Sequence, residues 1–133
     1  MILQFRGGVA VVVVSLATAA CAPRCVNEVL ESVVNPSGAK VAVLYTRNCG
    51  ATTGPSTNVS VLDSNSSVPQ EVGNVLVLKD PVSMAETSRS TRLRWLATDT
   101  LEVSLIGGRA VQSRVQIVDG IVVTYAIHSD RDP

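Results

Sequence analysis

Apolar and polar residues alternate along four stretches in the second half of the chain, at 92–95, 101–105, 112–117 and 121–127. A period of two puts the apolar side chains on one face of a strand and the polar ones on the other. Each stretch is therefore expected to be a strand with one buried face and one face in water. Asp119-Gly120, between the last two stretches, is the strongest hairpin signal and predicts a type I′ turn.

The segment 26–34 fits two patterns. Its apolar residues lie at helical spacing, and they are also compatible with the two faces of a strand. Asn35-Pro36-Ser37-Gly38 then predicts a turn, because Pro fixes φ and Gly tolerates positive φ, and Lys40–Arg47 reads as a strand. We favour a hairpin that pairs Glu28–Val34 with Lys40–Arg47; a helix over 26–34 is the alternative.

The middle of the chain continues the strand pattern. Thr57–Leu62 predicts a strand, Val75–Leu78 is an apolar run expected to be buried on both faces, and Asp80–Ser90 is polar and expected to be a loop. Gly107-Gly108 predicts a tight turn between the strands on either side of it. Together these elements predict a mainly β fold, a single antiparallel β-meander of about seven or eight strands curled into a small sandwich or an open barrel.

Composition agrees with a β domain. The chain has 133 residues, enough for one domain, and its apolar residues are mainly aliphatic, because aromatic residues make up only 3%. The 11 basic residues balance 11 acidic ones. This neutrality argues against nucleic acid as a partner, since phosphate binding needs an excess of Lys and Arg. We expect the β domain to span 28–128, followed by a charged tail at 129–133.

Residues 1–20 have the three parts of a signal peptide. Arg6 is the charged part, Gly7–Leu16 is the apolar part, and Ala17-Thr18-Ala19-Ala20 is the small-residue part before the cleavage site. The apolar part is shorter than the about 20 residues that a membrane-spanning helix needs. The sequence therefore predicts an exported protein.

Ala19-Ala20-Cys21 resembles the lipobox of bacterial lipoproteins, although Thr18 stands where that family usually has Leu or another larger aliphatic residue. The resemblance implies that Cys21 becomes the lipidated N-terminus and that 21–27 is a lipid-anchored or flexible lead into the domain. The membrane would then be a partner through this lipid, on its periplasmic or outer side. The alternative is ordinary cleavage, which gives a secreted protein with Cys21 as a free thiol or as the partner of another cysteine.

The chain contains 3 cysteines, so any disulfide leaves one over. If Cys21 carries the lipid, Cys25 and Cys49 are free to pair in an oxidising compartment. The predicted hairpin places Cys25 before one strand and Cys49 after the other, which brings the two thiols close. Such a bridge closes a loop of about 25 residues and is worth roughly 3–4 kcal/mol on the chain-entropy model.

A longer stretch carries a second resemblance. Arg47-Asn48-Cys49-Gly50-Ala51-Thr52-Thr53-Gly54, with Ser56–Val61 and Gly73-Asn74-Val75 after it, resembles a family of small uncharacterised bacterial envelope proteins. That family shares a CGATTG…ST.VS block and a later GN.F segment. The resemblance implies an exported, mostly β domain and implies no reaction. Pro55 and Leu76 stand where aromatic residues are expected in that family.

Asn35–Val43 resembles the S-P-D-G-K blade hairpin of TolB-type β-propeller repeats, and Trp95 with Asp99–Val103 resembles the second half of such a blade. One blade-sized unit is too little for a propeller, which needs at least about four blades. The resemblance therefore implies blade-like hairpins and no propeller.

Residues with catalytic chemistry are few. His128 is the only histidine and lies next to the charged tail, where a surface role is expected, and no catalytic residue, metal site or cofactor is predicted. The favoured function is a non-catalytic envelope lipoprotein, a protein-binding or structural β module with another envelope protein as its expected partner. The alternative is a small-ligand-binding or weakly hydrolytic domain that uses the Cys49–Ser56 loop. Its candidate residues are Arg47, Asn48, Gly50, Thr52, Thr53, Gly54 and Asn74.

Overall fold

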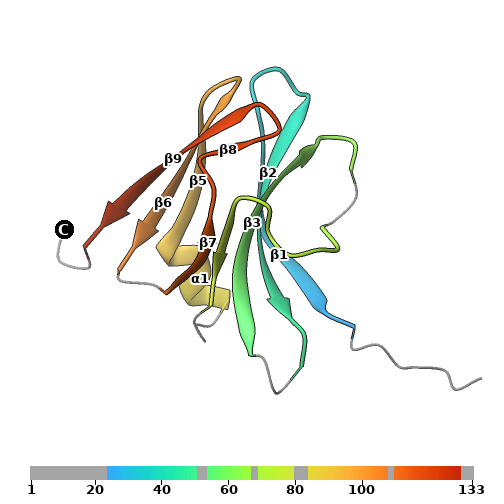
Figure 1. Ribbon diagram of the computed structural model, residues 1–133, viewed down its shortest axis with the longest axis vertical. Coiled ribbons are helices and arrows are strands. Elements are labelled where there is room, and N and C mark those ends of the chain that lie inside the picture. Colours follow the sequence, from blue (N-terminus) through green and yellow to red (C-terminus); the bar gives the residue numbers. More distant parts are fainter. Residues whose placement is uncertain (1–23, 51–53, 67–68, 80–83, 108–109, 130–133) are drawn as a thin grey trace, which may run out of the picture.

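A computed structural model describes residues 24–50, 54–66, 69–79, 84–107 and 110–129. The described strands form two sheets that face one another, and a short helix lies beside their ends (Figure 1). The mainly β fold and the sandwich predicted from the sequence are confirmed. The predicted features outside the described residues are the signal peptide, Cys21, Thr52, Thr53 and the tail from 130 onward.

Within the described residues, sheet A has five strands and is antiparallel throughout. Its spatial order is β1 (Val26–Val34), β2 (Lys40–Asn48), β3 (Pro55–Asp63), β4 (Leu76–Leu78) and β7 (Val111–Arg114). Sheet B has four strands, and its two central strands run parallel. Its spatial order is β5 (Thr91–Ala97), β6 (Thr100–Ile106), β9 (Ile121–His128) and β8 (Ile117–Val118).

The core lies between the two sheets and is mainly aliphatic. Alternate residues of the longer strands face it, as with Leu101, Val103 and Leu105 on β6. β4 is buried along its whole length, as its unbroken apolar run predicts. Each of these side chains contributes roughly 1.5–3 kcal/mol by leaving water, before the entropic cost of ordering the chain is counted.

β1 and β2 form the hairpin predicted between Glu28–Val34 and Lys40–Arg47, with β1 beginning two residues earlier, and the helical alternative for 26–34 is wrong. Val26 lies opposite Asn48 at the open end of this hairpin. Asn35 holds the turn at the other end, where its Oδ1 accepts from the backbone N–H of Lys40 at 3.1 Å. The extended form prevails because pairing with β2 satisfies the backbone of β1 and places it in the sheet.

Consecutive strands pair within β1–β4 and within β5–β6, but the single meander predicted from the sequence is broken between β4 and β5 and again after β6. β7, which follows β6 in sequence, lies in sheet A beside β4, and the chain then returns to sheet B as β8. β6 pairs with β9 instead, in parallel. β6 and β7 therefore do not form the hairpin that a tight turn at Gly107-Gly108 implied, and Gly108 lies outside the described residues. The strand predicted over 112–117 is divided between the two sheets. Buried β4 needs a neighbour on each edge to satisfy its backbone, and β7 supplies the second one.

The loop predicted over Asp80–Ser90 is in part a helix, α1 (Met84–Ser90). Its charges match the helix dipole, acidic in the first turn and basic in the last. The buried Thr87 places its Oγ1 3.1 Å from that of Thr57 on β3. A helix of 7 residues is too short to be stable alone, so packing against the sandwich decides its conformation.

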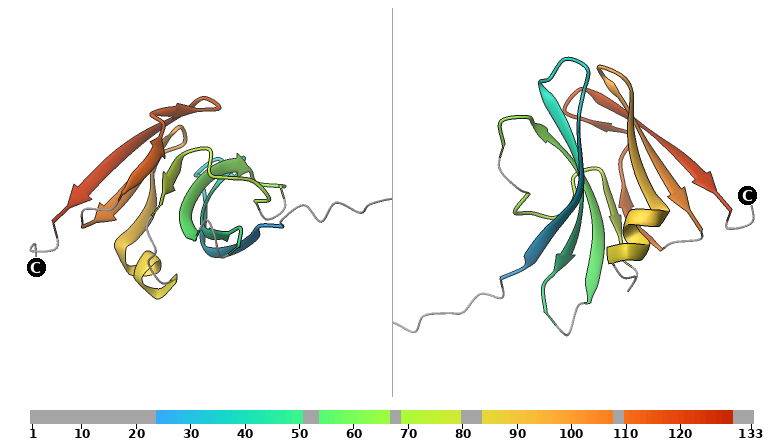
Figure 2. Two further views of the ribbon diagram at one scale, coloured as in Figure 1. Left: turned by 60° about the horizontal axis from the view of Figure 1, so that its bottom comes forward. Right: turned by 180° about the vertical axis from the view of Figure 1, so that it is seen from behind.

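Asp119-Gly120 forms the tight turn between β8 and β9, as predicted. Both residues have positive φ, 49° and 77°, as a type I′ turn requires. The two segments that resemble a propeller blade, at 35–43 and 95–103, lie in different sheets, whereas a blade holds its strands in one sheet. Sheet A curls strongly, and sheet B is flatter (Figure 2).

Candidate functional site

The disulfide between Cys25 and Cys49 closes the open end of the β1–β2 hairpin and confirms the predicted pair. The two Cα atoms are 4.0 Å apart. Cys25 directly precedes Val26, and Cys49 directly follows Asn48, so the bridge extends the strand pairing by one position. The loop that begins at Cys49 is thereby held at its base.

The Cys49–Ser56 loop is described in part. Asn48 Oδ1 accepts a hydrogen bond from the backbone N–H of Gly50 at 3.0 Å, which fixes the start of the loop. Gly50 and Gly54 have φ of 118° and 67°, a region that other residues resist. Two of the expected ligand donors, Thr52 and Thr53, lie outside the described residues.

A second segment, Pro69–Asn74, lies across the outer face of sheet A, and we call it the covering segment. Three consecutive carbonyl groups of this segment accept hydrogen bonds from side chains of β1 and β2. These bonds satisfy backbone groups that have no strand beside them. The donor and acceptor pairs are Asn27 to Pro69 (2.7 Å), Arg47 to Gln70 (2.9 Å) and Tyr45 to Glu71 (2.8 Å).

Arg47, a candidate ligand residue, is engaged within the protein. Its Nη1 donates to the Gln70 carbonyl and, at 3.1 Å, to Asn27 Oδ1. Asn27 in turn donates to the covering segment. The Arg47 guanidinium is thus held against that segment.

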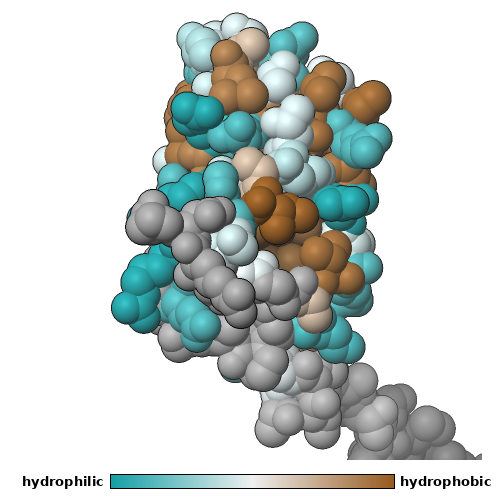
Figure 3. Space-filling view, turned by 90° about the vertical axis from the view of Figure 1, so that its left-hand side faces the viewer, coloured by the Kyte–Doolittle hydropathy of each residue, from teal (hydrophilic) through white to brown (hydrophobic). Residues whose placement is uncertain are grey.

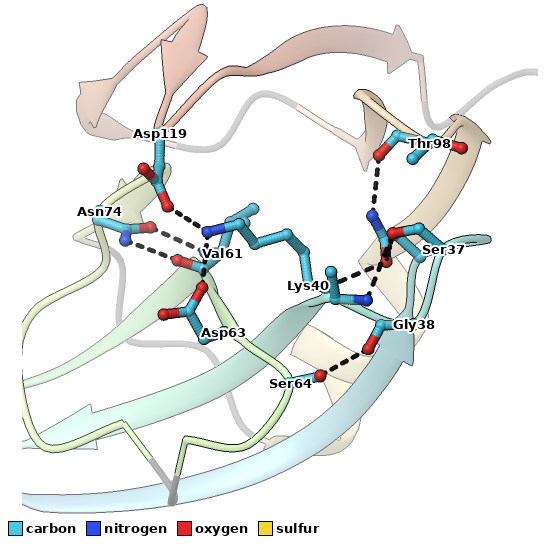
Figure 4. A network of polar contacts seen from close by, with 11 residues as sticks. Ser37, Gly38, Lys40, Val61, Asp63, Ser64, Asn74, Thr98 and Asp119 are labelled. Carbon is cyan, nitrogen blue, oxygen red and sulfur yellow. Dashed lines mark hydrogen bonds and ion pairs between the residues drawn. The ribbon is translucent and has the colours of Figure 1, made fainter.

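Asn74 pairs with β3 as a strand residue would. Its Oδ1 accepts from the N–H of Val61 at 2.8 Å, and its Nδ2 donates to the carbonyl of Val61 at 2.9 Å (Figure 4). Val61 stands about 17 Å along β3 from Ser56, where the Cys49–Ser56 loop ends, at about 3.3 Å per residue. The structure therefore does not bring Asn74 to that loop, although both were expected to form one site.

The sequence analysis missed the polar residues of β3 that hold the covering segment. Asn58 is fully buried, and its Oδ1 accepts from the Gly73 N–H at 2.9 Å. Ser60 Oγ accepts from the Asn74 N–H at 3.1 Å and lies 3.1 Å from the Tyr45 hydroxyl oxygen. These residues alternate with apolar ones, which is the same signal that a face in water gives. Alternation alone does not distinguish water from a segment of the same chain.

Two tyrosine hydroxyl groups are fixed by backbone carbonyls. Tyr45 donates to Glu71 at 2.8 Å, and Tyr125 on β9 donates to Val115 at 2.6 Å. Burial raises the pKa of Tyr45 and of Tyr125 above the usual value for a phenol. Both side chains therefore remain protonated at neutral pH and act as donors that join a strand to a neighbouring segment.

Lys40 joins the two sheets by charge. Its Nζ lies 2.7 Å from Asp63 Oδ1 on β3 and also contacts Asp119 in the β8–β9 turn (Figure 4). Hydrogen bonds to Asp119 and then to Asp63 raise the pKa of Lys40. Nearby, Asn35 donates from Nδ2 to the carbonyl of Thr98, between β5 and β6, at 2.9 Å. These contacts tie one end of the sandwich together.

Among the hollows on the described surface, two lie beside the covering segment on the outer face of sheet A, with volumes of about 320 and 240 Å³. A third, of about 470 Å³, lies where the chain passes between the sheets, next to β8 and β9. Arg114 lines it, with its guanidinium carbon 5.1 Å from the centre of the Tyr125 ring. Amide, hydroxyl and guanidinium groups lie beside apolar side chains in these linings.

Comparison with protein-family models, with curated proteins and with solved structures finds no match for this chain. In the described part of the chain, no three His, Cys, Asp or Glu side chains lie close enough together to hold a metal ion. No helix among the described residues is long and apolar enough to cross a membrane. Proposals about function therefore rest on the chain's own residues.

Proposed function

We propose that the chain is an exported, non-catalytic protein of a bacterial cell envelope, anchored to the membrane by a lipid on Cys21 and acting through contacts with other proteins. The Cys25–Cys49 disulfide carries this proposal. Disulfides form and persist in oxidising compartments such as the periplasm and are rare in the cytosol. Residues 1–20, which have the pattern of a signal peptide, precede this bridge closely in sequence.

The position of the bridge supports the anchor. β1 is an edge strand of sheet A, and a tether at its N-terminal end would pull first on the pair formed by Val26 and Asn48. The disulfide stands directly at that pair, between Cys21 and the rest of β1. It therefore bears such a pull covalently, where backbone hydrogen bonds alone would open one after another.

The bonding of the polar side chains supports a non-catalytic role. Arg47, Tyr45 and Asn74 each hydrogen-bond backbone groups of the chain itself. Side chains used in this way hold a surface in a fixed shape. A rigid surface of this kind suits recognition by another folded protein, because little conformational entropy is lost on binding.

Intact mass spectrometry of the full chain, isolated from a bacterial host, tests the proposal. We expect cleavage before Cys21, the added mass of acyl groups, and two thiols that react with an alkylating reagent only after reduction. Cys21→Ser is the matched control, which should abolish acylation and leave the Cys25–Cys49 bridge intact. An unacylated wild-type product would contradict the anchor. Cys25 and Cys49 thiols that react before reduction would contradict export.

A further inference from the structure

We propose that this protein self-associates through β9, by antiparallel pairing of the free edge of β9 with the same edge of a second copy. This goes beyond the proposed envelope role and does not depend on the lipid, because it concerns the folded domain alone. Three features of β9 support it: a backbone edge without a neighbouring strand, a sequence without the usual protection of such an edge, and a self-complementary register around Ala126.

β9 is paired along one side and only at its start on the other. On the first side it pairs with β6 in parallel from Val122 to His128. On the second side β8 pairs only with Ile121 and Val122, and one further bond joins the Val123 N–H to the Gln116 carbonyl at 2.8 Å. Beyond this point the chain departs towards sheet A, and no described strand takes its place beside β9.

The backbone groups of Tyr125 and Ile127 point to this free edge. Successive residues of a strand present their N–H and C=O groups to opposite edges. Val123 donates on the β8 side, whereas the His128 carbonyl accepts from the Gly107 N–H on the β6 side. Tyr125 and Ile127 lie two and four residues after Val123. Each of them therefore presents its backbone N–H and C=O to the edge of β9 that faces away from β6.

The sequence of β9 itself lacks the devices that protect the edge strands β1 and β5, although Arg114 of β7 lies over the Tyr125 ring from the neighbouring sheet. Natural edge strands are blunted by charged side chains, prolines and irregular pairing. β1 carries Glu28 and Glu31 with a register shift before Glu31, and β5 carries Arg92 and Arg94 with a register shift near its end. The run Ile121–Ile127 has no charged residue and no Pro, and its register with β6 is unbroken. An unprotected edge of this kind is expected to be paired with another strand in the functional form of the protein.

Apolar side chains are exposed along the same part of the molecule. Ile127 is 65% exposed, Ile117 69% and Val122 42%. Figure 3 shows the left-hand side of Figure 1, towards which the C-terminal end of β9 runs. Apolar side chains gather there between polar ones. Addition of a strand beside β9 would take part of this apolar surface out of water, which favours association.

A second copy fits this edge because the register around Ala126 is self-complementary. With a two-fold axis at Ala126, Tyr125 of each copy lies opposite Ile127 of the other, and their edge groups make four backbone hydrogen bonds, about two for each such pair. An aromatic side chain opposite a β-branched one is a favourable cross-strand pair. Thr124 lies opposite His128, so no two like charges are opposed. Because the ladder is short, we expect a weak and reversible dimer.

Cysteine cross-linking of the full chain in the exporting cell tests both the pairing and its register. Ala126→Cys places two thiols opposite each other on the axis, with Cα atoms about 4.5 Å apart, which is within reach of a disulfide. Thr124→Cys is the matched control, because it lies on the same face of β9 but its two copies would be about 14 Å apart. The wild type shows how much disulfide-linked dimer forms through Cys21 alone.

We expect at least tenfold more disulfide-linked dimer on a non-reducing gel for Ala126→Cys than for Thr124→Cys. Equal cross-linking at the two positions would mean random collision and would overturn the proposal. Ala126→Cys protein that accumulates with its Cys25–Cys49 bridge formed, and yet forms no linked dimer, would overturn it as well.

Substitutions at Ile127 separate edge pairing from folding. The Ile127 N–H points away from β6, so Ile127→Pro removes an edge donor and no bond within sheet B. In sedimentation velocity at rising concentration, we expect the wild type and Ile127→Val to shift towards the dimer and Ile127→Pro to remain monomeric with an unchanged circular dichroism spectrum. A wild type that remains monomeric overturns the proposal even if Ala126→Cys fails to accumulate. A dimer that persists in Ile127→Pro also overturns it.

Discussion

Trp95 on β5 donates its indole Nε1–H to the carbonyl oxygen of Val33 on β1, over 2.8 Å. β5 is an edge strand of sheet B and β1 is an edge strand of sheet A, so this bond joins the two sheets along one side of the sandwich. The Trp95 ring also packs against the core. Trp95 thus contributes both apolar burial and a hydrogen bond between the two sheets on this side of the sandwich.

Trp95→Phe should lower the free energy of unfolding by about 1–2 kcal/mol, because the ring remains apolar while the Val33 carbonyl loses a donor. Leu96→Ala is the control, since Leu96 is 48% exposed and is expected to contribute less than about 1 kcal/mol. Urea unfolding followed by far-ultraviolet circular dichroism measures both. If Trp95→Phe is as stable as the wild type, the bond to Val33 has no net stabilising effect.

Replacement of both Cys25 and Cys49 by Ser should lower the free energy of unfolding by about 3.5 kcal/mol, the chain-entropy value for a loop of about 25 residues. Cys21→Ser should leave the stability of the domain unchanged, which separates loss of the bridge from loss of any cysteine. The same urea titration, without reductant, measures both. A loss below about 1 kcal/mol would indicate that the unfolded β1–β2 hairpin already keeps its ends close.

Gly73→Ala should destabilise the protein by about 2–3 kcal/mol, as overpacking does. A Cβ at Gly73 would lie 2.6 Å from the Leu76 carbonyl oxygen and 2.8 Å from that of Val59, and both are backbone atoms that move only with their strands. Gly120→Ala is the matched comparison, because Gly120 has φ of 77° and nothing within 4 Å of an added Cβ. Its expected cost is the backbone strain alone, about 1 kcal/mol. Equal unfolding midpoints for the two variants would contradict the close approach at Gly73.

Stability should fall at alkaline pH. The pKa of Lys40 is raised above 10.5 by Asp119 and then Asp63, and burial raises the pKa of Tyr45 and of Tyr125 above 10.0. In each case the folded state holds its proton more tightly, so the contribution is complete below the unfolded pKa and is lost as the pH rises through the folded pKa. We expect the urea midpoint to be flat near pH 8 and to decline above about pH 10.

Two variants separate the contributions to this decline. Tyr45→Phe removes one phenol and should flatten part of the decline, and Lys40→Met should flatten another part. Urea midpoints measured from neutral to alkaline pH, for both variants and the wild type, give the comparison. A decline of the same steepness in all three proteins would exclude Lys40 and Tyr45 as its source.

The local sequence pattern is sufficient to predict the β1–β2 hairpin, the turn between β8 and β9, and the Cys25–Cys49 disulfide. The turns at Asn35–Gly38 and Asp119-Gly120 need particular residues for their φ values, so these residues mark the turns in the sequence itself. Cys25 and Cys49 flank the first hairpin, and antiparallel pairing of neighbouring strands brings them together. Contacts between segments that are adjacent in sequence leave little choice of geometry.

The candidate site shows where local pattern fails. Asn58 and Ser60 alternate with apolar residues as in a strand with one face in water, yet both are buried beneath the covering segment. Arg47 and Asn74 were grouped with the Cys49–Ser56 loop by their place in one sequence block, and the structure engages both with the covering segment or β3. A polar face of a strand meets water only if no other segment of the chain packs on it. The alternation of side chains within the strand does not show whether such a segment is present.

The sequence by itself determined most of the strands, the turns that reverse the chain and the cysteine pair, because side-chain periodicity, turn chemistry and short-range pairing are local properties. Tertiary structure alone decided that β6 and β9 run parallel, that β7 crosses to sheet A, and that 84–90 becomes a helix. These outcomes depend on which buried edges and faces remain to be covered once the sheets assemble. Which edges and faces remain uncovered is a property of the assembled fold, because the side-chain pattern of a strand or a short helix is the same whichever element packs beside it.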